Sequence, residues 1–596
     1  MHISKIKLWN FRKFGSENDF DLDAPDLDLP LFKGTNVLVG ENDSGKTAIV
    51  DAIRFALGTH SLDWNRIGFD DFHGDAGRLR IEVHFESLSE DEGKNFIEWL
   101  SWEKDDDGNV TTGLRLICDA RRSDERVHPY EVRAGADAEG SQISAEAREY
   151  LKCTYLRPLR DAHAELVPRQ NSRLSRIFQG HPAFKGAEED HHLVKLFGKF
   201  NDEIRSYFKG VDSEGNKLPD DQGKDLKDQV DGFIHAFYSA ESDGLIDVSG
   251  GSLKSILERL MLSIEDCRNP GLGTLNRLFM AAELVHLSKP SWSGLRTALI
   301  EELEAHLHPQ AQMRVIEELQ RRDNIQLILT SHSPNLTSKV PLSNLILCEG
   351  RNAFPLGADF TKLEPDDYKF LECFLDVTKS NLFFAKGVIL VEGWAEELLV
   401  PALAKLMKAR GLISQDLTEA GVSVVNVGGT SYLRYAKIFL RSSDPHIGIP
   451  VSIITDLDVP EYEKDGDDFV SRDAGAVATE KIAAANDKFK SLTDGSVQTF
   501  LAPDWTLEFS LQKSKSFSKL FEDSFRSAHP QAGTDMEFEV AKKLLNKGLK
   551  KQHIAYLMAN GIEADLTGPN EINIENDEAS AQYLIQGIKH ACGISD

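Results

Sequence analysis

The sequence predicts an α/β protein with two α/β units, the first of which is interrupted by a helical insertion. In each unit a short apolar run precedes a helical pattern: residues 35–39 before 46–57 in the first, and a similar alternation from Lys386 in the second. The third observation is the stretch 167–249, where apolar residues recur at spacings of three and four, as in amphipathic helices. A chain of 596 residues is long enough for several units, each with its own core.

Charge and composition limit the classes of protein to which the chain can belong. With 68 Lys and Arg against 96 Asp and Glu, the net charge is −28, which argues against a protein that coats nucleic acid, although a local basic strip can exist. There is no run of eighteen apolar residues, and the first residues alternate between apolar and polar, so we expect a cytoplasmic protein without a membrane segment. The six cysteines contain no CxxC pair, which argues against a zinc module or a disulfide framework.

A phosphate-binding motif lies between the first apolar run and its helix. The sequence GENDSGKT at 40–47 fits GxxxxGK[ST], and its place after a strand and before a helix favours ATP binding over an accidental glycine-rich turn. In such loops backbone amides and the helix N-terminus face the phosphates, a lysine reaches the β- and γ-oxygens, and a hydroxyl binds Mg²⁺. The residues expected to bind ATP and Mg²⁺ here are Asn42, Ser44, Gly45, Lys46 and Thr47.

Two further segments supply residues suited to ATP hydrolysis. The apolar run in TALIEELEAHLHP ends in two acids, of which we expect Glu301 to bind Mg²⁺ and Glu302 to orient the attacking water. The apolar run in LILTSHSPNL leads to His332, which is placed to sense the γ-phosphate. His306 and His308 could suggest zinc, but an HxH pair in a loop without a cysteine partner more often caps or packs.

A second acidic set occurs near the start of the second unit. VILVEGWAEELL places Glu392 after an apolar strand and Glu396 four residues later, and VSIITDLDVP ends a strand on Asp456 and Asp458. Residues two apart in a strand point the same way, and the carboxyl ends of parallel strands share one edge of a sheet, so these acids would converge. Converging carboxylates repel one another unless a divalent cation lies between them. The alternative interpretation is that these are solvated acids at strand ends.

The motifs of the first half resemble a known family. The segments IKLWNFRKF, GENDSGKT, EELEAHLHP and TSHSPN, with the long insertion, look like the ATPase head of the ABC/SMC-like class, and specifically that of the OLD (overcoming lysogenization defect) nucleases. The resemblance implies that ATP lies between two heads and is contacted in trans by a signature loop. Two loops compete for this role, 249–251 in VSGGS and NPGLGTLNRLFMAA around Gly271 and Gly273. We favour the second, and Gly273 as a nucleotide-binding residue, because this loop opens a helix shortly before Glu301.

The motifs of the second half resemble the Toprim domain of topoisomerases, primases and OLD nucleases. The resemblance depends on the order of VEGWAE, the Gly-Gly turn after VSVVNV, and TDLD. It implies one more acid, Glu508 in WTLEFSL, and a catalytic lysine, Lys551 in KKQHIAYLMA. Tyr432 is the tyrosine closest to the acids in sequence, and we interpret it as structural, which favours hydrolysis over strand passage.

The chemistry implied for this domain is metal-dependent cleavage of a phosphodiester. Two Mg²⁺ or Mn²⁺ ions could activate water and stabilise the leaving oxygen, while the lysine offsets charge on the phosphate. The expected metal-binding residues are Glu392, Glu396, Asp456, Asp458 and Glu508.

The resemblance covers nearly the whole chain and implies a domain organisation. We expect an ABC-type ATPase head at 1–166 and 250–365, a helical dimerisation insertion at 167–249, a linker at 366–385, and an α/β Toprim nuclease domain at 386–596.

The implied function is that of an ATP-hydrolysing, metal-dependent DNA endonuclease in bacterial antiphage defence. The implied partners are DNA and a second copy of the chain, and in some members a helicase, as in Gabija, or a retron reverse transcriptase. The alternative is a non-catalytic DNA-clamping ATPase of the SMC/RecF-like class involved in DNA repair.

Overall fold

The protein is described from a computed structural model of residues 1–596. The description covers the chain except for residues 17–18, 61–65, 105–109, 158–167, 171, 180, 185–189, 221, 238–240, 266, 268–269, 288–293, 466–467, 472–478, 480–482, 484–495, 569–571, 575–579 and 595–596. The expected domain boundary between residues 166 and 167 lies outside the described residues. None of the described helices is both long and apolar enough to cross a lipid bilayer.

The first unit is centred on a six-stranded sheet, the core sheet, of order β13-β12-β3-β11-β10-β9. Its strands are β3 (Thr35–Val39), β9 (Thr154–Leu156), β10 (Thr297–Ile300), β11 (Gln326–Thr330), β12 (Leu345–Glu349) and β13 (Asn352–Pro355). Neighbours from β12 to β9 pair in parallel, whereas the edge strand β13 pairs antiparallel with β12. Parallel strands are covered on both faces, which explains why β3 and β11 are apolar runs that are buried at every position.

The helix α1 (Lys46–Leu57) joins the core sheet to an antiparallel sheet. It begins after Gly45, whose φ of 101° is left-handed and therefore suits glycine. Its apolar side chains pack in one cluster with Leu38 of the core sheet and Ile81 of the antiparallel sheet, so the helix lies between the two.

The antiparallel sheet has the order β2-β1-β4-β6-β7-β8, and β5 pairs with β6. Its strands are β1 (His2–Trp9), β2 (Leu27–Pro30), β4 (Arg78–Glu86), β5 (Leu100–Lys104), β6 (Val110–Arg121), β7 (Val132–Ala134) and β8 (Ser141–Gln142). Three short helices accompany it, η1 (Phe69–Asp71), α2 (Glu90–Lys94) and α3 (Ala145–Glu149).

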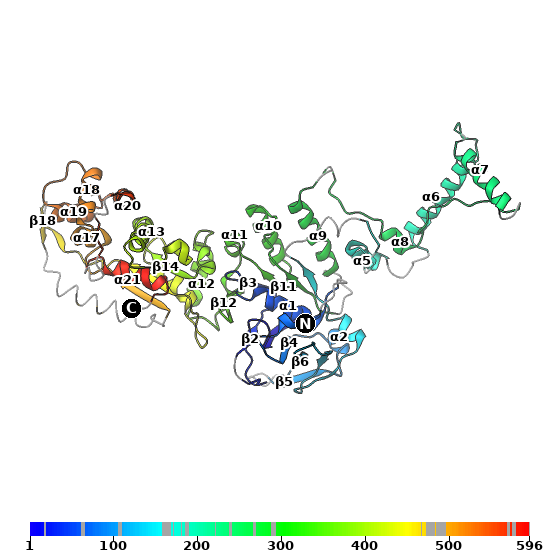
Figure 1. The fold of residues 1–596 in the computed structure, drawn as a ribbon, viewed down its shortest axis with the longest axis horizontal. Helices are drawn as coiled ribbons and strands as arrows, with labels where there is room; N and C mark the ends of the chain where they lie inside the picture. Colours follow the sequence, from blue (N-terminus) through cyan, green and yellow to red (C-terminus); the bar gives the residue numbers. More distant parts are fainter. Residues whose placement is uncertain are drawn as a thin grey trace.

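The helices described between β9 and β10 are α5 (Arg173–Gln179), η2 (Pro182–Phe184), α6 (His192–Phe208), α7 (Gln222–Phe237), α8 (Leu253–Leu257) and α9 (Leu272–Leu287). The outer helices α6 and α7 form an arm that points away from the rest of the molecule (Figure 1). At the base of the arm, Leu174 and Ile177 of α5 pack against Ala282 of α9. The outer helices α6 and α7 bury none of their apolar side chains.

The second unit contains a four-stranded parallel sheet, the Toprim sheet, of order β15-β14-β16-β19. Its strands are β14 (Gly387–Val391), β15 (Val422–Asn426), β16 (Val451–Thr455) and β19 (Val497–Leu501). A two-stranded sheet is added by β17 (Tyr462–Asp465) and β18 (Asp468–Ser471). The central strands β14 and β16 are buried at every position, as expected for strands covered on both faces.

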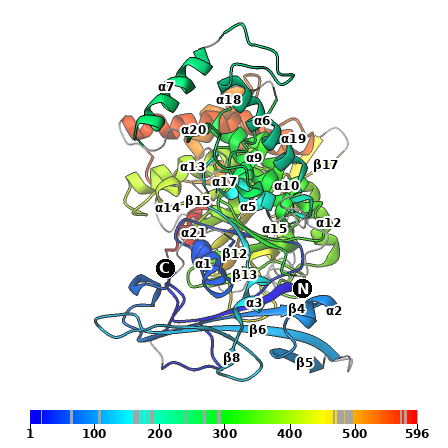
Figure 2. The same ribbon diagram turned by 90° about the vertical axis from the view of Figure 1, so that its right-hand side faces the viewer.

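Helices surround both parallel sheets. Those that follow strands of the core sheet are α10 (Pro309–Gln320), α11 (Pro334–Thr337) and η3 (Leu342–Asn344). Those of the second unit are α13 (Trp394–Ala409), α14 (Leu417–Ala420), α15 (Tyr432–Ala436), η5 (Lys437–Phe439), α17 (Leu507–Lys513), α18 (Ser518–Ala528), α19 (Met536–Leu545), α20 (Lys551–Thr567) and α21 (Gln582–Ala591). α13 and α20 lie side by side in both views (Figures 1 and 2).

The two faces of the Toprim sheet belong to different cores. Ile389 and Val391 of β14 pack with α13 and the C-terminal helices. Val388 and Leu390, which alternate with them, pack in a cluster that continues into the core sheet through Phe354. The alternation of side chains along one strand therefore connects the two units.

The segment 366–385, which we expected to be a linker, is packed. Most of it lies in α12 (Pro365–Phe374) and η4 (Lys379–Phe384), and Leu371, Leu382 and Phe383 are all buried in the cluster that joins the two units. The segment therefore contributes to the core.

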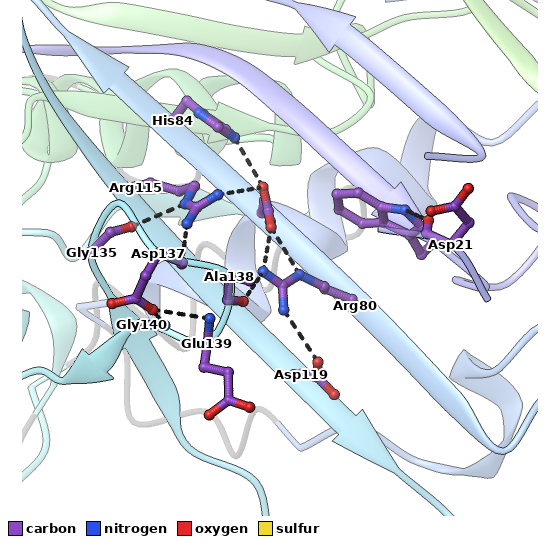
Figure 3. Close-up of polar contacts among 12 residues, drawn as sticks. Asp21, Arg80, His84, Arg115, Asp119, Gly135, Asp137, Ala138, Glu139 and Gly140 are labelled. Carbon is purple, nitrogen blue, oxygen red and sulfur yellow. Dashed lines mark hydrogen bonds and ion pairs between the residues drawn. The ribbon is translucent and has the colours of Figure 1, made fainter. Parts of the chain in front are cut away.

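A network of charged side chains covers the outer face of the antiparallel sheet (Figure 3). Arg80 and Glu82 are only 2% and 4% exposed, and the Arg80 guanidinium donates to the Glu82 carboxylate at 2.5 and 2.8 Å. His84 lies 3.2 Å from the other carboxylate oxygen and Arg115 lies 3.7 Å from it. Burial alone would raise the pKa of Glu82, but hydrogen bonds from His84 and Arg80 and the charges of both arginines lower it to about 2.

We predict that Glu82 stabilises the fold in a pH-dependent way. Because its folded pKa is below its ordinary value of 4.5, its contribution is complete above that value and is lost as the pH falls toward 2. Glu82→Gln should lower the free energy of unfolding by roughly 2 kcal/mol at pH 7, and the difference from wild type should narrow below about pH 5. Urea unfolding from pH 7 to pH 3 measures this. The exposed Glu86→Gln on the same strand is the control, and a difference independent of pH would contradict the prediction.

Candidate functional site

The phosphate-binding loop connects β3 to α1 at the carboxyl edge of the core sheet. The Lys46 side chain lies back over the loop, where its Nζ donates to the Gly40 carbonyl and the Ser44 hydroxyl, each at 3.0 Å, and to the Glu41 carbonyl. Gly40 has a φ of 134°, and a Cβ there would come within 2.3 Å of the Cys348 carbonyl oxygen. The loop is therefore in close contact with β12, and glycine is required at its first position. Asn42 lies at the exposed tip of the loop.

The predicted magnesium-binding pair, Thr47 and Glu301, is assembled across the core sheet. The Thr47 hydroxyl donates to Glu301 Oε2 at 2.9 Å, and the Tyr155 hydroxyl donates to Glu301 Oε1 at 2.6 Å. Glu301 is 2% exposed, and this burial raises its pKa despite the two hydrogen bonds. A hydroxyl and a buried carboxylate in contact fit the oxygen ligands of Mg²⁺ next to a phosphate.

Glu302 and His332 lie beside the same loop. Glu302 follows β10 with a left-handed φ of 44°, and its amide donates to the Thr330 hydroxyl at 3.0 Å. Burial lowers the pKa of His332, and the nearby charge of Lys46 lowers it further, while that of Glu302 raises it. The structure thus brings together Lys46, Glu302 and His332 from segments that follow three different strands, β3, β10 and β11.

The two candidate signature loops lie in different surroundings. Gly273 is in the first turn of α9, where a Cβ would come within 2.3 Å of the His306 carbonyl oxygen. Asn276 of the same helix donates to the Ala305 carbonyl at 3.3 Å. The favoured loop therefore packs against the segment that follows Glu302, whereas Gly251 of the other candidate lies against Phe197 of the arm.

The acids of the second unit gather at the carboxyl edge of the Toprim sheet, and we call the group of Glu392, Glu396, Asp456, Asp458 and Glu508 the acidic site. Glu392 follows β14 directly, and its carboxylate accepts from the Thr455 hydroxyl at the end of the neighbouring strand β16. Asp456 accepts from the Leu507 amide at 2.8 Å.

One detail of the expected geometry is wrong. The strand β16 ends at Thr455, so Asp456 and Asp458 do not share a face of that strand. Asp458 is exposed and has a left-handed φ of 56°, and the backbone turns between the two acids. Loop geometry, and not strand alternation, places this pair.

Glu396 and Glu508 come from helices that pack beside the sheet. They are 8% and 2% exposed, and Lys551 of α20 lies 3.0 Å from Glu508 Oε2. Burial alone would lower the pKa of Lys551, but the charges of Glu508 and Asp456 raise it to about 12.

Three of the acids have raised pKa values. Burial is the main cause at each, and it raises the pKa of Glu396 to about 6 with a further contribution from the charge of Glu508. Burial and the charges of Glu508, Glu396 and Glu392 raise the pKa of Asp456 well above its ordinary value. The pKa of Glu392 is raised by burial and by Asp458. Neighbouring acids therefore disfavour the charged forms of Glu392, Glu396 and Asp456.

Two opposing observations bear on whether these residues could hold a divalent cation. Among the described residues, no three His, Cys, Asp or Glu side chains converge in a geometry ready for an ion. Several oxygens of the acidic site are bound instead by Thr455, the Leu507 amide and Lys551. Within the same part of the chain, the buried Oε1 of Glu508 has no hydrogen-bond partner. Carboxylates with raised pKa values and an unsatisfied oxygen are the donor set that Mg²⁺ or Mn²⁺ would satisfy after small side-chain movements.

Several residues of these sites were not found by the sequence analysis. Tyr155 and Glu304 act in the first site, where Glu304 accepts from the Ser331 hydroxyl at 3.0 Å and the His332 amide at 2.5 Å. The residues missed in the second site are Thr455 and Tyr583. Tyr583 lies on α21 and is 7% exposed, and burial and the nearby acids raise its pKa well above its ordinary value. Of these four residues, Thr455 was the one that a sequence motif could have indicated, because it is the first residue of TDLD.

A cavity of about 330 Å³ separates the phosphate-binding loop from the second unit. Glu41 and Asp43 line it on the loop side, and Lys386 and Ile449 line it on the other. Lys386 lies 4.0 Å from Glu41 across this space. The nucleotide-binding loop and the base of the Toprim sheet are thus direct neighbours.

The fold and the two sites define an ATPase domain joined to a Toprim domain. The family described as "AAA domain, putative AbiEii toxin, Type IV TA system" matches residues 35–338, just over half of the chain, and "Overcoming lysogenization defect protein-like, TOPRIM domain" matches residues 383–458. The chain belongs to the OLD family, with an ATPase domain of that AAA type. The predicted family and fold class are confirmed.

Several known proteins are similar to the chain at low sequence identity. An OLD nuclease of Thermus scotoductus is 23% identical over 489 residues, 75% of this chain and 82% of that protein. Endonuclease GajA of Bacillus cereus (strain HuB5-5) is 20% identical, covering 94% of this chain and 91% of that protein. The retron Ec83 probable ATPase of Escherichia coli is 23% identical over 59% of this chain and 72% of that protein.

Proposed function

We propose that the protein is an ATP-hydrolysing, divalent-metal-dependent DNA endonuclease that cleaves phosphodiester bonds at the acidic site. The observation that carries this proposal is the group of acids with raised pKa values at one edge of the Toprim sheet, beside Lys551. Such a group gains most from cations, and cations held there are suited to a phosphate substrate.

The residues of the acidic site have separate roles in this proposal. Two Mg²⁺ or Mn²⁺ ions bound there would activate water and stabilise the leaving oxygen. Glu392, Asp456 and Asp458 would hold the first ion, and Glu396 and Glu508 would complete the ligands of the second. Lys551, which is paired with Glu508 at 3.0 Å, would offset the negative charge that develops on the phosphate.

The names of the relatives support the substrate and the biological setting. Two are called OLD nuclease and endonuclease GajA, which supports a nucleic acid as the substrate. A third is called a retron ATPase. We propose a role in antiphage defence, with a helicase or a retron reverse transcriptase as the partner to be sought.

We predict that Asp456→Ala lowers the rate of plasmid nicking in Mg²⁺ or Mn²⁺ by at least about a hundredfold, because water activation and leaving-group stabilisation both depend on the ions. Its rate of ATP hydrolysis should be unchanged, since that site is in another domain. Nicking of supercoiled plasmid and phosphate release are the two measurements. Asp465→Ala, an exposed acid on β17, is the matched control.

Full nicking activity in Asp456→Ala would refute the acidic site as the nuclease centre. If the wild-type protein binds DNA without nicking it in either metal, the non-catalytic clamping ATPase is the better assignment. Loss of both activities in the variant would indicate misfolding, which circular dichroism checks.

At the ATP site we predict that two variants lose ATP hydrolysis for different reasons. Lys46→Ala should lose ATP binding because it removes the cation that contacts the phosphates. Glu302→Gln should bind ATP with wild-type affinity but hydrolyse it at least about a hundredfold more slowly, because it no longer orients water. Equilibrium binding and phosphate release separate the two effects, with the exposed Glu317→Gln as the control. Wild-type turnover in Glu302→Gln would show that Glu302 has another role.

We propose that the arm formed by α6 and α7 dimerises the protein. On α7 the exposed apolar residues recur at helical spacing, with Leu226 53%, Val230 37%, Phe233 63% and Phe237 83% exposed. On α6, Leu196 and Phe200 are 47% and 50% exposed. A second copy of the arm would bury both stripes, as one amphipathic helix pair does against another.

We predict that the double variant Leu226→Glu/Phe233→Glu is a monomer, because it places two charges in the proposed interface. Light scattering coupled to size exclusion gives the mass. Lys224→Glu, on the opposite side of α7, should leave the dimer intact. A double variant with the mass of the wild-type dimer would exclude this stripe as the interface.

A further inference from the structure

An exposed tryptophan stands beside the acidic site. Trp394 is the first residue of α13 and lies in sequence between Glu392 and Glu396, yet 61% of its side chain is exposed. Exposing so large an apolar ring to water is unfavourable, and such residues at a functional site commonly contact a ligand.

Two further exposed side chains lie along the seam between α13 and α20. Both helices start at the acidic site, because Lys551 at the start of α20 is paired with Glu508 and its pKa is also raised by Glu396 of α13. Toward their other ends, Lys405 of α13 lies 3.0 Å from Glu563 of α20. The two helices therefore run in the same direction.

This pairing fixes which residues face each other. Leu398 lies seven residues before Lys405, and Tyr556 lies seven residues before Glu563. Seven residues are close to two helical turns, so Leu398 and Tyr556 lie on the same sides of their helices as the ion pair and at the same level along the seam. Leu398 is 39% exposed and Tyr556 is 52% exposed.

Trp394 lies one turn before Leu398 on the same side of α13, at the end nearest the acids. Together Trp394, Leu398 and Tyr556 form what we call the aromatic strip. It follows the seam between α13 and α20, two helices whose ribbons lie side by side in Figure 2. Lys551 and Lys405 lie near its two ends.

We propose that the aromatic strip binds the unpaired bases of a DNA strand whose scissile phosphate lies at the acidic site. The inference rests on the proposed nuclease function. Every base presents a flat apolar face to a ring, so stacking on Trp394 and Tyr556 requires no particular sequence. In a duplex these faces are covered by neighbouring bases, so the strip favours single strands, flaps or locally opened DNA.

Base stacking also explains how a protein with a large negative net charge could bind DNA. A net charge of −28 disfavours binding through phosphates alone. Stacking does not depend on phosphate neutralisation, so unpaired DNA can be held on an acidic protein with few cations. The salt dependence of binding should therefore be shallow.

The test uses tryptophan fluorescence with an unlabelled oligothymidylate as the probe, in EDTA so that no cleavage occurs. Wild-type emission should be quenched on binding, and Trp394→Phe should lose most of this quenching. Trp102→Phe is the matched control, because Trp102 is 64% exposed on β5, in the antiparallel sheet of the other unit. Equal quenching in wild type and Trp394→Phe would overturn the proposal.

Affinity gives an independent readout that does not use the intrinsic fluorophore. By anisotropy of a labelled oligothymidylate, Trp394→Ala and Tyr556→Ala should each weaken binding roughly tenfold, while a duplex of equal length should bind weakly to all proteins. Equal affinities in wild type and both variants, or duplex bound as well as the single strand, would refute the strip as a base-stacking surface.

Failure of this proposal can be told apart from failure of the proposed function. Binding is measured without metal, whereas the nuclease assignment is tested by nicking with Asp456→Ala. A protein that nicks plasmid but shows no Trp394-dependent quenching keeps its nuclease site and loses the strip. Quenching with wild-type nicking in Asp456→Ala would retain the strip as a DNA-binding surface and move the catalytic centre elsewhere.

Discussion

Both sites lie where parallel strands end at the carboxyl edge of a sheet, and their residues depend on that position. Parallel strands buried on both faces are mostly apolar, so charged residues are accommodated most easily where the strands stop. In the core sheet this edge collects the phosphate-binding loop, Glu302 and the segment before His332. In the Toprim sheet it collects Glu392 and Asp456. Burial at these edges then raises the pKa of Glu301 and Glu392, which prepares both for cations.

The close packing of the two units gives their sites a physical connection. One apolar cluster continues from the core sheet to one face of the Toprim sheet, and the expected linker is part of it. In β12, the Cys348 carbonyl lies against Gly40 of the phosphate-binding loop. The next residue, Glu349, accepts a hydrogen bond from the Gly448 amide at 3.4 Å. Gly448 lies shortly before β16, the strand that leads to Asp456. Direct contacts therefore connect the phosphate-binding loop, through β12, to the residues that precede β16.

The sequence identified the residues of local motifs better than their geometry. GENDSGKT could be recognised because such a loop depends on a backbone conformation set within eight residues, and in the structure its Thr47 donates to Glu301. The acids of VEGWAE and TDLD were also found, because each follows an apolar run. Their arrangement was not, since β16 ends at Thr455 and Asp458 adopts a left-handed φ. That turn depends on contacts with residues distant in sequence, such as the Asp458 amide donating to the Trp505 carbonyl at 3.0 Å.

The sequence by itself determined the two α/β units, the motif residues and the apolar stripes of α6 and α7, because periodicity and short motifs are properties of neighbouring residues. Only the tertiary structure decided which distant groups meet. Tyr155 on Glu301, Thr455 on Glu392 and Lys551 on Glu508 are contacts between segments separated by 43 to 146 positions. The alignment of Leu398 with Tyr556 likewise depends on how α13 packs against α20. Such pairings follow from chain topology and packing, which no local pattern in the sequence records.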